Sequence, residues 1–97
     1  MNYIIPESRL KQVIFKYLDM QNLNIVKRGV YVYFTENVRD RYGFLKYNYY
    51  TESLFILKVF ADNISDMFGL SVKESGQIIS SWVENTLGVK VNLIKIK

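Results

Sequence analysis

Carboxylates are the first candidates for acid–base or metal chemistry in this chain. The sequence contains neither histidine nor cysteine, which removes imidazole proton transfer, thiol nucleophiles and the usual zinc ligand sets. Two carboxylate pairs have a spacing that could bring them together, Glu36 with Asp40 and Asp62 with Asp66. Such pairs can work as acid and base or hold a cation. Because neither pair has a third ligand or a glycine-rich frame beside it, we expect turn and helix-surface roles and no metal site.

Catalytic motifs of other kinds are missing from the sequence. We find no phosphate-binding loop, no dinucleotide-binding glycine pattern and no nucleophile motif. Ser80 and Ser81 have no base placed beside them by any motif, so we interpret them as helix surface. The sequence therefore predicts a protein that is not an enzyme and needs no cofactor, and whose function rests on binding.

Aromatic side chains are the second group that could take part in binding. The chain has eight tyrosines, six phenylalanines and one tryptophan. Residues 40–47 (DRYGFLKY) echo the pattern that places base-stacking aromatics on a strand of RNA-recognition motifs. That fold begins with a strand and has a helix between its two aromatic strands, and the element order of this chain rejects it. Stacking of bases on exposed tyrosines stays open without the fold, at about 1–3 kcal/mol per base.

The elements that must position these side chains are those of a small α+β domain. Residues 6–19 place their apolar side chains on one stripe and are predicted to form an amphipathic helix. Residues 22–36 predict a β-hairpin that turns at Lys27, Arg28 and Gly29, and residues 41–50 predict a further strand. Residues 54–57 (LFIL) fit a short strand or the start of a helix equally well.

The second half of the chain predicts two helices and a terminal strand. The first helix is expected to end at Gly69. The second is expected to begin at Ser71, which has capping-box spacing to Glu74, and to end at Gly88. Gly76 lies inside the second helix and indicates close packing there. We expect a single domain over residues 1–97 with the order α-β-β-β-α-α-β, in which an antiparallel sheet of three or four strands carries about three helices on one face.

Charge and hydropathy place further limits on the partner. The net charge of +4 permits an acidic partner without requiring one. We interpret Lys90, Lys95 and Lys97 as protection of a sheet edge, with a phosphate-contacting tail as the alternative. The first residues lack a secretory signal pattern, and the apolar run at residues 54–57 is far too short to cross a membrane. We therefore expect an intracellular protein with no membrane contact.

Two segments give the chain a resemblance to a group of small uncharacterised proteins of tailed bacteriophages. They are PESRLKQVIFKYLD at residues 6–19 and MFGLSVKESGQIISSWVENTLGVKV at residues 67–91. In both this chain and that group, an amphipathic helix comes first and a helix with the pattern W-V-E-x-T-L comes late. The resemblance covers less than half of the chain. It implies a viral origin and a location in the host cytoplasm, and it brings no activity, ligand or site residue.

Together these features predict a non-enzymatic phage accessory protein that binds a host protein or a nucleoprotein complex. Inhibition of a host defence is the most specific form of this prediction. Direct binding of single-stranded nucleic acid and a role as a small virion component are the alternatives. Eight tyrosines are more than one small core needs, and exposed tyrosines beside arginine are typical of binding surfaces. We predict that the partner binds the solvent face of the sheet, through Arg28, Tyr31, Tyr33, Arg41, Tyr47 and Tyr49.

Overall fold

The computed structural model describes residues 7–37 and 43–97 as three helices and a five-stranded sheet. The α+β class is confirmed, and the element order is the expected one with one more strand. Of residues 54–57, which the sequence left open, the first three belong to that strand and Leu57 is the N-cap residue of the helix that follows. In chain order the elements are α1 (Glu7–Met20), β1 (Asn24–Arg28), β2 (Tyr31–Thr35), β3 (Leu45–Asn48), β4 (Ser53–Ile56), α2 (Lys58–Phe68), α3 (Val72–Leu87) and β5 (Leu93–Ile96).

The strands lie in the sheet in chain order, β1-β2-β3-β4-β5. Strands β1 to β4 pair antiparallel, whereas β5 pairs parallel to β4. The expected all-antiparallel sheet of three or four strands is therefore wrong in its last strand. The physical reason is that α2 and α3 form the connection between β4 and β5, and a helical crossover returns the chain in the same direction.

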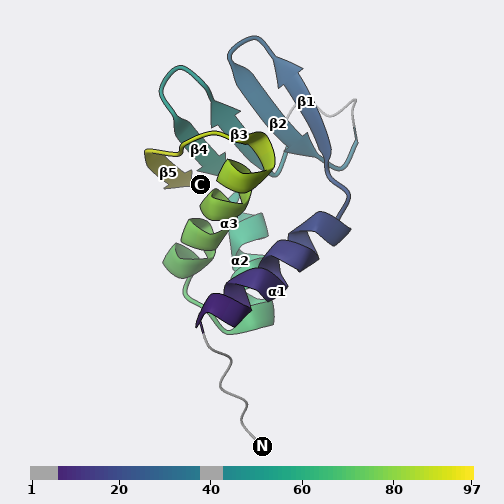
Figure 1. Ribbon diagram of the computed structural model, residues 1–97, viewed down its shortest axis with the longest axis vertical. Coiled ribbons are helices and arrows are strands. Elements are labelled where there is room, and N and C mark those ends of the chain that lie inside the picture. Colours follow the sequence, from purple (N-terminus) through teal and green to yellow (C-terminus); the bar gives the residue numbers. More distant parts are fainter. Residues whose placement is uncertain (1–6, 38–42) are drawn as a thin grey trace, which may run out of the picture.

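Within the described residues, the helices cover one face of the sheet (Figure 1). In Figure 1 the three helices gather on one side of the sheet, and the tip of the β1–β2 hairpin extends beyond them. Side chains alternate between the two faces along a strand, and every second residue of β2, β3 and β4 is buried against the helices. The core consists of Ile14, Leu18, Val32, Phe34, Leu45, Tyr47, Leu54, Ile56, Phe60, Ala61, Ile64, Ile79, Trp82 and Val83.

Helix α3 has the ends and the packing that its sequence predicts. The Ser71 hydroxyl accepts a hydrogen bond from the Glu74 backbone N–H at 3.1 Å, and the Glu74 carboxylate accepts one from the Ser71 N–H at 3.3 Å. Gly88 ends the helix in the left-handed conformation with φ of 66°. A Cβ atom on Gly76 would lie 2.7 Å from Cδ1 of Ile96, so this glycine lets β5 pack closely on α3.

Candidate binding face of the sheet

The side of the sheet opposite the helices is its outer face. Cross-strand neighbours point to the same side, so the register shows which side chains meet there. Tyr33 is opposite Lys46, Lys46 is opposite Phe55, and Phe55 is opposite Lys95. These four side chains form one row across β2, β3, β4 and β5, in which rings and ammonium groups alternate. We call this row of Tyr33, Lys46, Phe55 and Lys95 the outer row.

The cations of the outer face lie against its rings. The Lys46 Nζ atom is 4.7 Å from the centre of the Phe55 ring and 4.8 Å from that of Tyr31. Lys95 and Lys97 approach the same Phe55 ring at 5.2 and 5.8 Å. A cation within about 6 Å of a ring centre is attracted by the ring quadrupole, so Phe55 holds three ammonium groups together.

A second cation–ring contact lies at the β1–β2 end of the same face. The Cζ atom of Arg28 is 5.8 Å from the ring centre of Tyr33. The rings of Tyr31 and Tyr33 are 6.1 Å apart. Together with the outer row, these contacts define four outer cations, which are Arg28, Lys46, Lys95 and Lys97.

Acidic groups lie elsewhere in the described part of the chain. None of the five strands contains an aspartate or a glutamate. Glu36 lines a small hollow with Tyr17 and Phe60 on the helix side of the sheet. The Glu84 carboxylate also faces that side, where it accepts a hydrogen bond from the Val91 N–H at 2.9 Å. The outer face therefore carries positive charge without a carboxylate on its own strands, which favours an anionic partner.

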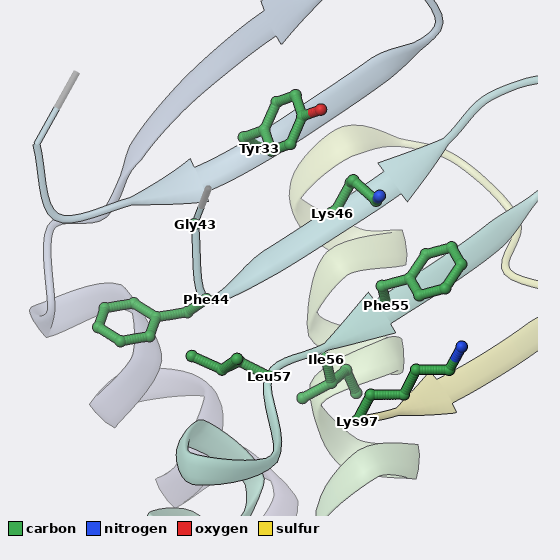
Figure 2. A pocket seen from close by; sticks show the side chains of 8 residues that line it. All are labelled: Tyr33, Gly43, Phe44, Lys46, Phe55, Ile56, Leu57 and Lys97. Carbon is green, nitrogen blue, oxygen red and sulfur yellow. The ribbon is translucent and has the colours of Figure 1, made fainter. Parts of the chain in front are cut away.

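A hollow of about 240 Å³ opens at one end of the outer row. Figure 2 shows Tyr33, Lys46 and Phe55 on three neighbouring strands, with the Lys97 side chain extended toward Phe55. Phe44 and Leu57 form the opposite wall. Most of the wall is apolar, and the charged residues of its lining are Lys46 and Lys97. The full lining is Tyr33, Gly43, Phe44, Lys46, Phe55, Ile56, Leu57 and Lys97.

Three of the six predicted site residues lie on the outer face. Tyr31 and Tyr33 are half-buried there, and Arg28 is exposed beside them. Tyr49 does not join them, because its ring packs edge-on against Tyr47 at 5.1 Å and the Lys27 ammonium lies 5.5 Å above it on the helix side. Arg41 lies outside the described residues.

The placement of Tyr47 on the solvent face is wrong. Tyr47 is 1% exposed, and it pairs across the sheet with the buried Val32. Its hydroxyl donates a hydrogen bond to the Lys90 carbonyl oxygen at 2.6 Å. Burial, with smaller contributions from Glu52 and neighbouring groups, raises the pKa of the Tyr47 phenol above its ordinary value. The side chain is part of the core because β3 turns the Leu45–Tyr47 face toward the helices.

The DRYGFLKY stretch does not supply an aromatic platform. Phe44 stacks on Phe60 of α2 with ring centres 5.1 Å apart, and Leu45 and Tyr47 are buried. A Cβ atom on Gly43 would collide with the Phe34 carbonyl oxygen, so this glycine serves close backbone packing. Lys46 is the residue of β3 that contributes to the outer row.

Sequence reasoning did not single out Lys46 and Phe55, and for Lys95 and Lys97 it favoured edge protection over phosphate contact. The alternation within β3 held a usable signal, because an apolar Leu45 on the core side forces Lys46 outward. In the same way Ile94 and Ile96 alternate with Lys95 and Lys97. No signal within a single strand could show that these lysines meet around one Phe55 ring, because cross-strand register decides it.

The carboxylate candidates Glu36, Asp62 and Asp66 reach the surface, and Asp40 lies outside the described residues. Asp62 pairs with Lys58 one helical turn earlier at 3.8 Å. Within the described residues, no group of three His, Cys, Asp or Glu side chains could hold a metal ion. The expectation that Ser80 lies on the helix surface is wrong, since it is buried, while the Ser81 hydroxyl donates to the Gln77 carbonyl at 3.1 Å.

No protein-family model matches the chain, and neither the curated proteins nor the solved structures contain a significant match to it. Within residues 7–37 and 43–97, no helix has the length and apolar character needed to cross a membrane. Inferences about function therefore rest on the outer face itself.

Proposed function

We propose that the protein is a non-catalytic binding protein that holds single-stranded nucleic acid, free or within a nucleoprotein complex, on the outer face of its sheet. The outer row is the observation that carries this proposal, because rings and cations alternate across four strands that contain no carboxylate. Rings of this kind stack unpaired bases, and the cations between them neutralise phosphates.

The shape of the face favours a single strand over a duplex. Reading a duplex usually requires a helix or a two-stranded ribbon that enters a groove. Here the rings and cations lie on a sheet surface, and the three helices pack against the opposite side. Ring faces on a sheet are accessible only to bases that have left a double helix.

The phage resemblance adds a biological setting to this proposal. A viral protein that holds host nucleic acid within a nucleoprotein complex in the host cytoplasm would interfere with the complex, and inhibition of a host defence is the sharpest outcome. Capture of a host protein is the second candidate. The cluster of Arg28, Tyr31 and Tyr33 favours it, because tyrosine and arginine dominate the hot spots of protein interfaces.

A salt titration of strand binding tests the proposal. Fluorescence anisotropy with a labelled oligothymidylate gives the binding constant, whose logarithm falls with log salt by about 0.7 per phosphate contact. If all four outer cations contact phosphates, the slope is about −3. We expect Lys95→Gln to reduce the slope by about 0.7.

Lys16→Gln is the matched control, since it removes the same charge from an exposed position on α1. We expect it to leave the slope unchanged. Equal effects of Lys95→Gln and Lys16→Gln would show that net charge alone attracts the strand. That result, or the absence of strand binding at low salt, would overturn the proposal and leave protein capture as the better candidate.

A further inference from the structure

The hollow at the end of the outer row has apolar walls and a charged rim. Phe44 and Leu57 supply the apolar wall, and the Phe55 ring supplies an aromatic one. Lys46 and Lys97 bring ammonium groups to the rim. We propose that this hollow receives one unstacked nucleobase of the bound strand, while the two lysines contact the phosphates beside it. This inference rests on the proposed function and assigns a specific subsite to it.

The size of the hollow suits one base. A cavity of about 150 Å³ with apolar walls binds a single benzene ring. The hollow holds about 240 Å³, which leaves room for the ring system of one base with its exocyclic groups. Sites for larger organic ligands begin near 300 Å³. A stack of several bases would therefore have to continue outside it, along the outer row.

The chemistry of the walls separates a base from simpler occupants. An aliphatic side chain would leave the Lys46 and Lys97 charges without a counterpart, and a bare phosphate would leave the apolar wall of Phe44 and Leu57 exposed to water. A nucleotide satisfies both parts, because it joins a flat ring to an anion. Charge complementarity with a sheet that has no acidic strand residue points to the same occupant.

The walls are held in place before any ligand binds. The Phe44 N–H donates to the Phe34 carbonyl oxygen at 2.8 Å, and the Leu57 N–H donates to the Phe44 carbonyl oxygen at 2.9 Å. On the other side, the Lys97 N–H donates to the Ile56 carbonyl oxygen at 3.1 Å. Stacking of Phe44 on Phe60 fixes its ring. A preformed pocket spends little binding free energy on ordering its walls.

Methyl NMR spectra of the full chain test the subsite directly. The probes are an oligothymidylate and a strand of equal length in which abasic units carry the same phosphates. A base in the hollow shifts the Leu57 methyl resonances through its ring current. We expect oligothymidylate to shift them and the abasic strand to leave them in place. The exposed Val59 methyl groups, which do not line the hollow, serve as the internal control.

A matched pair of variants tests the same subsite by affinity. Leu57→Glu places a carboxylate in the wall of the hollow, and Val59→Glu adds the same charge two residues later at a still more exposed position. We expect Leu57→Glu to weaken oligothymidylate binding at least about fivefold, the least that one stacked base contributes, and Val59→Glu to weaken it clearly less.

The outcomes separate the subsite from the function. If oligothymidylate binds with the expected salt slope but the Leu57 methyl resonances do not move, the subsite is wrong and the proposed function stands. If neither strand binds, both fail. A glutamate-rich peptide that shifts these resonances when oligothymidylate does not would assign the hollow to an acidic protein segment and overturn the nucleobase assignment.

Discussion

The two faces of the sheet use tyrosine for opposite purposes. Tyr33 on β2 and Tyr47 on β3 lie on neighbouring strands. Tyr33 pairs with Lys46, and Tyr47 pairs with Val32. Tyr47 is 1% exposed and ties β3 to the Lys90 carbonyl, whereas Tyr33 keeps part of its ring in solvent with a guanidinium above it.

This difference teaches that strand parity, and not residue type, separates the core from the outer face here. The apolar residues on each side of Tyr33 are buried, so Tyr33 must point outward. The residues on each side of Tyr47 are polar, so Tyr47 must point inward. A count of tyrosines identifies neither role.

The largest expected difference in stability is between two variants that each lose one ring, one from the core face and one from the outer face. Phe34→Ala opens a cavity beside Trp82, whose ring centre lies 5.2 Å from that of Phe34, and we expect it to lower the free energy of unfolding by about 3–5 kcal/mol. We expect Tyr33→Ala, one residue away on the outer face, to cost less than about 1 kcal/mol. Denaturant unfolding of both variants measures the contrast, and similar losses would contradict the assignment of the two faces.

Removal of the buried Tyr47 hydroxyl is expected to cause a smaller loss of stability, and the contribution of this group depends on pH. We expect Tyr47→Phe to lower the free energy of unfolding by about 1 kcal/mol, because the Lys90 carbonyl loses its donor. Below the ordinary tyrosine pKa near 10, Tyr47 is protonated in both states and its full contribution is present. Above that pH the unfolded chain ionises first, so the stability of the unmodified protein falls as pH rises toward the raised folded-state pKa.

Denaturant unfolding across pH 9–11 compares this variant with Tyr50→Phe. Tyr50 is 86% exposed, so the control keeps the alkaline loss of stability. We expect the loss to be shallower in Tyr47→Phe, since the group with the raised pKa is gone. An identical alkaline slope in both variants would show that Tyr47 is not responsible.

The helices could be predicted because their signals are local. The apolar stripe of residues 6–19, the capping box of Ser71 and Glu74, and the terminal Gly88 each act within one or two helical turns. Structure and sequence agree at these positions, because the groups that satisfy the helix ends are near neighbours in the chain.

The sheet and its outer face depend on contacts between distant segments. The sequence of residues 54–57 fits a strand and a helix equally well. Residues 54–56 form a strand because they pair with β3 and β5. The parallel direction of β5 follows from the two-helix connection, which no pattern within β5 reveals. Tyr31 and Tyr33 lie on the outer face, as the clear apolar alternation in β2 predicts. Tyr47 was misplaced because tyrosine fits either side of a half-buried sheet, and its residue type was given more weight than the polar residues that flank it in β3.

The central claim is that the outer face, and not the opposite side, binds the strand. The most direct test removes two rings from each side at constant net charge, as Tyr33→Leu with Phe55→Leu and as Tyr17→Leu with Tyr49→Leu. Anisotropy with labelled oligothymidylate measures the affinity of both double variants, after thermal unfolding has shown each to be folded. We predict that the outer pair loses at least about fivefold in affinity and that the other pair binds as the unmodified protein does. Equal affinities of the two double variants would contradict the claim.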